Sequence, residues 1–249
     1  MNTYESLKND IVNMGIKPDD TIKIHSSMKK IGATEGGADT VLEVFCDYLG
    51  SEGLLVLPAH TWGTVQDYDY IYNPDKTPSN LGLLPNLFRQ RKGVYRSFHP
   101  THSVCAFGKG AKDFVSGIYP QITPCGKNSC YKKLYDLGAR VLLLGVTLTS
   151  NTFFHQIEES REEEIPPSHF KKQPMPCKIE LSGGNYIDNP IYLSPVDTSK
   201  QFDRVMDAVL KESSTVTGKI GQADCILVDC KKIFPVISKL LDENPKIFY

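Results

Sequence analysis

Short apolar runs of strand length alternate with amphipathic helical segments over residues 20–160, and this alternation most constrains the fold. Residues 21–27 read TIKIHSS, in which Ile22 and Ile24 alternate with other residues before the segment turns polar, as a strand does at its C-terminal end. A helical pattern follows, and then a second apolar run, GLLVLP, at 53–58. The alternation predicts an α/β protein with three layers, α/β/α, and a largely parallel central sheet.

The same periodicities place the other elements. Expected helices share apolar residues three and four apart: 4–14, 38–49, 83–91, 129–138, 151–164, 202–212 and a last one to about 241. Expected strands are short apolar or alternating runs: 103–108, 140–146, 177–181, 185–193 and 225–229. The strands after 170 predict a small C-terminal antiparallel addition. We expect residues 1–249 to form a single domain.

Composition excludes several classes of protein. Lys plus Arg (28) nearly balances Asp plus Glu (29), so no overall positive field favours nucleic acid. No apolar run approaches the ~20 residues that span a bilayer, and the first residues do not resemble a signal peptide, so we expect a cytoplasmic protein without membrane contact. Seven cysteines, an odd number, indicate buried thiols rather than a disulfide framework.

The segment HSSMKKIG (25–32) follows the first expected strand. Its hydroxyls, backbone N–H groups and lysines suit a phosphate, and open α/β sheets bind ligands at the carboxyl ends of their strands. The alternative is an ordinary strand-to-helix turn whose serines cap backbone groups.

The segment RSFHPTHSVC (96–105) gathers His99, His102 and Cys105, which are residue types that bind zinc. Strand alternation separates these side chains and Pro100 bends the segment, so a polar pocket rim or structural histidines are favoured and no metal is expected. A nucleophilic Cys105 or Cys125 is a further alternative.

The segment NTFFHQIEE (151–159) places His155 and Glu158 three residues apart on a helix. The two side chains therefore share a face, and the carboxylate can orient the imidazole and stabilise its charged form. The pair follows RVLLLGV, the strongest candidate for a buried strand, so it is expected at the sheet edge where sites form. The alternative is a half-buried histidine beside solvated carboxylates.

Five motifs occur in one order: HSSMKKIG, GADTVLEVFCDYLGSEGLLVLPAHTW (37–62), RKGVYRSFHPTHSVCAFG (91–108), LLLGVTLTSNTFFHQIEE (142–159) and GKIGQAD (218–224). Through them the chain resembles the aminoglycoside 3-N-acetyltransferase family, also called the antibiotic N-acetyltransferase family, over about residues 5–235.

The resemblance implies an α/β/α enzyme that uses acetyl-CoA or another acyl-CoA as co-substrate, with no metal. It implies binding of the CoA phosphates and pantetheine by two groups of residues: His25, Ser26, Ser27 and Gly32, then Arg96, Ser97 and Ser103. It places His155, with Glu158, at the reaction centre. The expected partner is a small-molecule amine; a homodimer is left open.

Two departures from the family pattern concern the acceptor. Many aminoglycoside-modifying members carry an aspartate six residues before the helix histidine, where this chain has Thr149. A site for polycations also needs carboxylates, for which the chain offers mainly Asp67, Asp69 and Asp75 in an aromatic loop, and Glu162 to Glu164. The acceptor is therefore expected to be an aminoglycoside or an amino sugar, including a nucleotide-linked amino sugar of glycan biosynthesis.

The predicted mechanism is direct transfer, with His155 taking the proton of the attacking amine and Glu158 orienting it. Two alternatives from other classes are a CoA-binding homologue without turnover, and a zinc or cysteine hydrolase built on residues 99–105.

Overall fold

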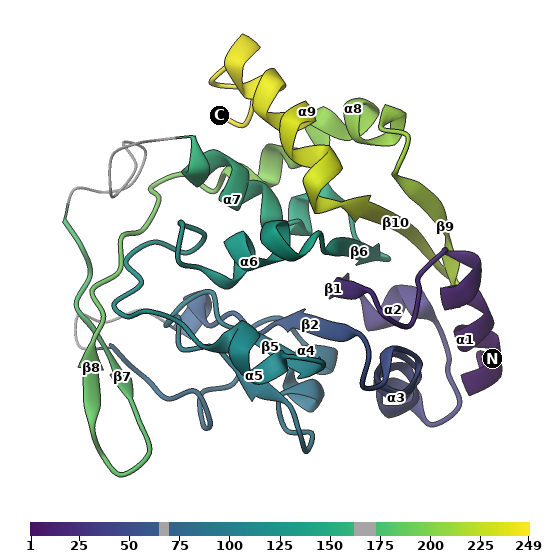
Figure 1. Ribbon diagram of the computed structural model, residues 1–249, viewed down its shortest axis with the longest axis horizontal. Helices are drawn as coiled ribbons and strands as arrows, with labels where there is room; N and C mark the ends of the chain where they lie inside the picture. The colour runs from purple at the N-terminus through teal and green to yellow at the C-terminus, as the bar shows by residue number, and fades with distance from the viewer. Residues whose placement is uncertain (65–69, 162–172) are drawn as a thin grey trace.

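A computed structural model describes residues 1–64, 70–161 and 173–249. Within these residues the main sheet has seven strands (Figure 1). In spatial order they are β4 (Tyr95–Arg96), β5 (Val104–Gly108), β2 (Leu54–Pro58), β1 (Thr21–Ser26), β6 (Arg140–Leu144), β10 (Ala223–Asp229) and β9 (Val216–Ile220).

The sheet is mixed. Strands β2, β1 and β6 are parallel, whereas the β4–β5, β5–β2, β6–β10 and β10–β9 pairs are antiparallel. The expected α/β class and the C-terminal antiparallel addition are confirmed, but the parallel part is restricted to the three central strands. A short turn at Gly221 reverses the chain between β9 and β10, and a Cβ there would lie 2.7 Å from the Ile31 carbonyl oxygen. This close approach explains the glycine.

Helices cover both faces of the sheet, which gives the expected three layers (Figure 1). One layer contains α1 (Tyr4–Asn13), α2 (Met28–Ile31), α3 (Gly37–Leu49) and α4 (Leu83–Phe88). The other contains α5 (Ala111–Val115), α6 (Cys130–Leu137), α7 (Phe153–Ser160), η3 (Thr198–Val205), α8 (Met206–Lys211) and α9 (Cys230–Glu243). Alternate residues of β6 pack on opposite faces of the sheet: Leu142 packs against the first layer and Val141 against the second.

A second sheet of three strands orders β3 (Tyr70–Tyr72), β7 (Cys177–Glu180) and β8 (Tyr186–Asp188). The strands expected at 177–181 and 185–193 are therefore present, in a separate sheet rather than at the edge of the main one. Strand β3 pairs in parallel with β7, about a hundred residues later in the chain. The aromatic stretch that contains β3 shows no sustained period, so this pairing was not predicted.

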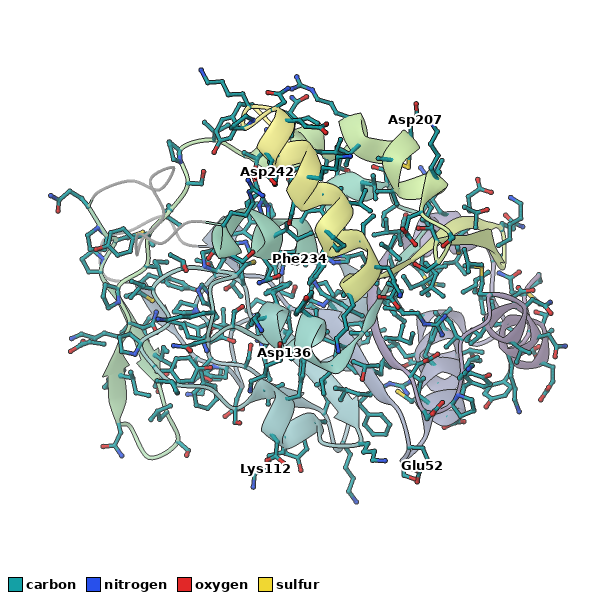
Figure 2. The ribbon with its side chains drawn as sticks, turned by 45° about the horizontal axis from the view of Figure 1, so that its top comes forward. Glu52, Lys112, Asp136, Asp207, Phe234 and Asp242 are labelled. Carbon is teal, nitrogen blue, oxygen red and sulfur yellow. The ribbon has the colours of Figure 1, made fainter. Side chains whose placement is uncertain are left out.

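Ion pairs lie on the outside of the layer that contains α6 and α9. Asp136 pairs with Lys132, and Asp242 of α9 pairs with Arg161 of the adjoining α7 terminus (Figure 2). The seven cysteines are buried free thiols, as expected. Across the three described ranges, no helix has the length and apolarity to cross a bilayer.

Candidate active site

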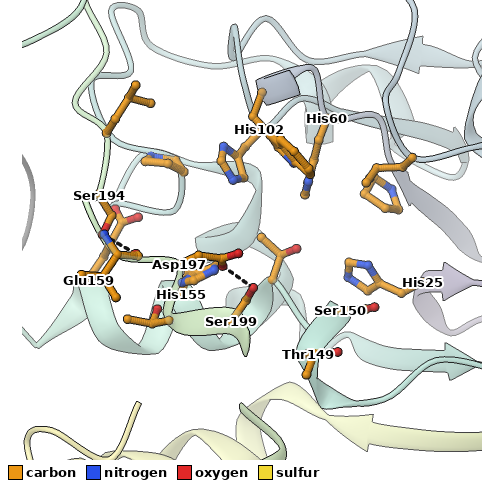
Figure 3. A pocket seen from close by; sticks show the side chains of 18 of the residues that line it. His25, His60, His102, Thr149, Ser150, His155, Glu159, Ser194, Asp197 and Ser199 are labelled. Carbon is orange, nitrogen blue, oxygen red and sulfur yellow. Dashed lines mark hydrogen bonds between the residues drawn. The ribbon is translucent and has the colours of Figure 1, made fainter. Parts of the chain in front are cut away.

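The carboxyl ends of the parallel strands surround a pocket of about 590 Å³ (Figure 3). His25 and Ser26 come from the end of β1, and His60 follows β2. After β6, the 3₁₀ turn η2 (Leu148–Ser150) contributes Thr149 and Ser150. Because β5 runs antiparallel to β2, His102, just before β5, lies at the same edge. This is the position at which open α/β sheets bind ligands.

His155 enters this pocket from the first turn of α7. Its Nδ1 lies 2.8 Å from Oε2 of Glu158, three residues later on the same helix face. The same Glu158 oxygen accepts a hydrogen bond of 3.2 Å from the Thr198 hydroxyl, so the carboxylate is held from two sides. The imidazole is 27% exposed and Glu158 only 8%. With Nδ1 engaged, Nε2 is the nitrogen left for a ligand.

The surroundings of His155 favour its charged form. Burial alone would lower the pKa of the imidazole, but the hydrogen bond and charge of Glu158, with the charges of Glu159 and Asp197, outweigh burial and raise it. The arrangement is that of a proton acceptor whose basicity is increased by neighbouring carboxylates.

The opposite wall carries three imidazoles that stay neutral: His25, His60 and His102 (Figure 3). Burial holds the pKa of each well below its usual value, and the charge of Lys23 lowers it further for His25 and His60, as neighbouring imidazoles do for His102. His60 Nε2 lies 2.7 Å from the hydroxyl of buried Tyr131, and the His60 and His102 ring centroids are 4.7 Å apart.

Glu159, next to Glu158 on the chain, is a carboxyl group of the pocket wall and is 6% exposed. One of its oxygens accepts a hydrogen bond of 2.9 Å from the Cys125 backbone N–H. Burial raises the pKa of Glu159 to about 7, against the hydrogen bonds that favour ionisation. Near neutral pH the Glu159 carboxyl group is therefore partly protonated and partly ionised.

The residues expected at the CoA phosphates divide into two groups. His25 and Ser26 line the pocket, whereas Ser27 and Gly32 do not. The Ser27 N–H donates to the Leu144 carbonyl, so it is already used. Gly32 ends α2 at φ +86°, and a Cβ there would come within 2.6 Å of the Gln222 side chain. Gly32 therefore permits close packing of the turn.

Arg96, Ser97 and Ser103 are hydrogen-bonded inside the protein and do not line the pocket. Arg96 donates to Ser103 Oγ at 3.1 Å and to the carbonyl oxygens of Pro74, Thr77 and Ala59. Ser103 in turn donates to the Ala59 carbonyl at 2.7 Å, and Ser97 Oγ accepts the Val104 N–H. In this structure the three residues join the loop after β2 to β4 and β5.

The histidine and cysteine cluster at 99–105 does not converge. His99 Nδ1 accepts hydrogen bonds from the backbone N–H groups of Thr101 and His102. Cys105 packs in the core between the sheet and the layer of α1 and α3. Burial raises the pKa of Cys105 to about 12 and that of Cys125 well above its usual value, so both thiols stay protonated. In the described part of the chain no group of three His, Cys, Asp or Glu side chains forms a metal site.

Two expected acceptor-binding residues, Asp67 and Asp69, lie outside the described residues, as do Glu162 to Glu164. The structure adds pocket residues that the sequence did not single out. They are His60, Trp62, Glu159, and residues 192–199, which include Asp197 and Thr198. Only Glu159 had a local signal, since it adjoins the His155 and Glu158 pair.

Fold and pocket define a protein of the α/β class with a small-molecule site at the carboxyl ends of its parallel strands. The sequence model of the aminoglycoside 3-N-acetyltransferase family matches residues 24–242, and the chain belongs to this family. The members of this family are acetyl-CoA-dependent transferases.

Individual relatives and solved structures are similar to this chain over most of its length. The SPbeta prophage-derived aminoglycoside N(3')-acetyltransferase-like protein YokD of Bacillus subtilis (strain 168) is 29% identical, covering 90% of this chain and 87% of YokD. Its crystal structure matches 98% of this chain and 95% of its own with a TM-score of 0.84 and 26% identity. The structure of AAC-IIIb with CoASH shares the fold at a TM-score of 0.83, with 23% identity and coverage of 97% and 96%. A mutant of AAC(3)-IVa in complex with apramycin shares it at 0.82, with 24% identity and coverage of 98% and 94%.

Proposed function

We propose that this protein transfers an acetyl group from acetyl-CoA to an amine of an aminoglycoside or amino-sugar acceptor, by direct attack on the thioester with His155 as general base. The observation that carries the proposal is the 2.8 Å bond between Glu158 and Nδ1 of His155, which lines the pocket. Membership of the family supports the reaction, and the CoASH complex of AAC-IIIb supports the donor.

An amine attacks a carbonyl carbon only through its free lone pair, so a base must remove its proton. His155 Nε2 takes this proton while Glu158, fixed by Thr198, orients the ring and stabilises the imidazolium. The N–C bond forms, the C–S bond breaks, and the imidazolium returns the proton to the departing thiolate. The balance needs no further reactant.

The donor site is proposed at the end of β1. Acetyl-CoA supplies the activated acetyl thioester. His25 and Ser26 present polar groups to the pocket there, and Thr149 and Ser150 stand beside them (Figure 3). A volume of about 590 Å³ lies within the usual range for small-molecule sites.

One observation favours an acceptor with few amines. Thr149, at the position where many aminoglycoside-modifying members carry aspartate, lines the pocket and bonds Thr147 Oγ1 at 2.9 Å. Among the described pocket residues only Glu159 and Asp197 carry carboxylates, and the Ser199 hydroxyl bonds Asp197. An amino sugar, free or nucleotide-linked, therefore fits this part of the wall better than a polycation.

A panel experiment tests the proposal. The protein is mixed with acetyl-CoA and either aminoglycosides or free and nucleotide-linked amino sugars, and released thiol is measured. Release with either group supports acetyl transfer and identifies the acceptor class. Stabilisation by CoA without release from any acceptor would instead support a non-catalytic CoA-binding homologue. Absence of both effects would overturn the proposal.

A further inference from the structure

The central strand places a polar pair where its neighbours are apolar. Ile22 and Ile24 of β1 face the layer of α1 and α3, so Lys23 and His25 face the layer of α6, α7 and α9. On the flanking strands that face is apolar, with Val56 in β2 and Val141 and Leu143 in β6. Lys23 is nevertheless completely buried, at 0% exposure.

The contacts of Lys23 are few. Its Nζ lies 3.0 Å from Nε2 of His25 and 4.2 Å from the centroid of the Tyr131 ring. Within the described ranges it forms no ion pair with a carboxylate, and besides His25 and Tyr131 the titratable groups that act on its amine are the thiols of Cys125, Cys130 and Cys230. Burial lowers the pKa of Lys23 to about 7.

Stability does not explain this lysine. Burying an ammonium group without a counter-charge is costly, and an apolar side chain of similar length would pack against Val56 and Val141 without that cost. Departures from a consistent apolar pattern occur chiefly where function requires them. The partner of Lys23 is a pocket residue, since His25 reaches the cavity at the end of β1 (Figure 3).

We propose that Lys23 is a positioning residue: it donates to His25 Nε2, holds the imidazole in the Nδ1–H tautomer, and so makes His25 a fixed hydrogen-bond donor to the acyl donor bound at the end of β1. When Lys23 is protonated, its ammonium group has three donors and no acceptor, so His25 Nε2 then accepts the 3.0 Å bond. A neutral imidazole whose Nε2 accepts carries its hydrogen on Nδ1.

The identity of the ligand in this proposal rests on the proposed function, whereas the tautomer assigned to His25 does not. The matching group on the donor is an oxygen that accepts hydrogen bonds, as in the amide or thioester carbonyls of an acyl-CoA. Because the neighbouring positive charge also opposes protonation of His25, this donor stays neutral and does not take protons from the reaction.

Nitrogen NMR of ¹⁵N-histidine-labelled protein tests the tautomer, because the two neutral forms give different couplings between ring nitrogens and carbon-bound protons. A His25→Asn variant assigns the signals. We expect the Nδ1–H form in the wild type and its loss in Lys23→Met, which removes the donor. Tyr131→Phe is the matched control: it keeps the ring beside Lys23 and should leave the His25 tautomer unchanged.

Kinetics give a second measurement. Loss of one fixed hydrogen bond should raise the KM for acetyl-CoA about 3- to 10-fold in Lys23→Met, with kcat nearly unchanged. If Lys23→Met does not fold, Lys23→Gln, which keeps an N–H donor, should retain the Nδ1–H signal.

An Nε2–H form of His25 in the wild type would overturn the proposal, as would a Lys23→Met protein with unchanged tautomer and KM. Should no acceptor be acetylated at all, the tautomer is still measured and the affinity for CoA replaces KM, so failure of the proposed function is distinguishable.

Discussion

Two imidazoles on opposite walls of one pocket have opposite surroundings. His155 is bonded to a carboxylate, with two more acidic groups nearby, and its pKa is raised. His25 is bonded to a lysine amine in a drier position, and its pKa is lowered well below the usual range. The same side chain thus has a raised pKa on one wall and a lowered pKa on the other, because the two rings have different partners and different burial.

The strongest test of this difference is His155→Ala. Removing a general base costs ~10²–10⁴ in rate, so kcat should fall by that factor while the KM for acetyl-CoA changes little. Steady-state kinetics with an accepted amine measure the loss, and a thermal shift with CoA checks that the donor still binds. A variant that keeps about a tenth or more of the wild-type kcat would contradict the assignment.

Glu158→Gln makes the surroundings of His155 more like those of His25. Without the negative charge, the pKa of His155 should fall, so the acid limb of the kcat profile should move to lower pH. Loss of orientation and charge stabilisation should lower kcat by roughly 10², the smaller end of the range for general-base help.

A pH series from about 5 to 9 measures both effects, and Thr198→Val, which removes only the second bond to Glu158, is the milder control. An acid limb that stays in place would separate Glu158 from the titration of His155.

Glu159→Gln tests the Glu159 carboxyl group of the pocket wall through its effect on the free energy of unfolding. The pKa of Glu159 is raised from 4.5 to about 7, so between these values the folded protein holds a proton that the unfolded chain has lost. The free energy of unfolding should therefore decrease as pH rises through this window, by about 3 kcal/mol at most.

Glutamine keeps an oxygen for the Cys125 N–H and does not ionise, so this decrease should be absent in the variant. Urea unfolding at about pH 5 and pH 8 measures it, with Glu212→Gln as control, because the lowered pKa of Glu212 keeps that carboxylate ionised over this range. Equal pH dependence in wild type and Glu159→Gln would show that Glu159 ionises normally.

The sequence predicted the central strands of the main sheet because their apolar residues form short runs or alternate with polar ones. The runs at 21–27, 53–58 and 140–146 became β1, β2 and β6, the parallel centre of the sheet. Strand β9 was missed because Val216–Ile220 lies at the sheet edge with mostly exposed side chains, so it has no apolar alternation. Strand β3 was missed because its partner is distant in the chain.

For the site, spacing was informative where one helix carries both partners. His155 and Glu158 are three residues apart, so helix geometry alone brings them together. Arg96 and Ser103 show the opposite case, since a guanidinium and a hydroxyl suit phosphates and backbone carbonyls equally, and only tertiary structure shows which they contact. Residues 192–199 reach the pocket through a long excursion that no local pattern indicates. Lys23 did carry a signal, a charge inside an apolar strand.

Trp62→Ala should have the smallest effect, and it locates the acceptor relative to the two imidazoles. Trp62 lines the pocket near the neutral histidines and is 53% exposed, so its indole face is available to a sugar ring. Stacking contacts of aromatic rings contribute about 0.5–1.5 kcal/mol, which predicts a rise in the acceptor KM of about 3- to 10-fold with kcat and the KM for acetyl-CoA unchanged. Trp62→Phe should restore most of the affinity. Tyr95→Ala, at an exposed aromatic residue away from the pocket, should change neither KM. A rise in the KM for acetyl-CoA instead would place the donor, rather than the acceptor, against the wall that carries Trp62.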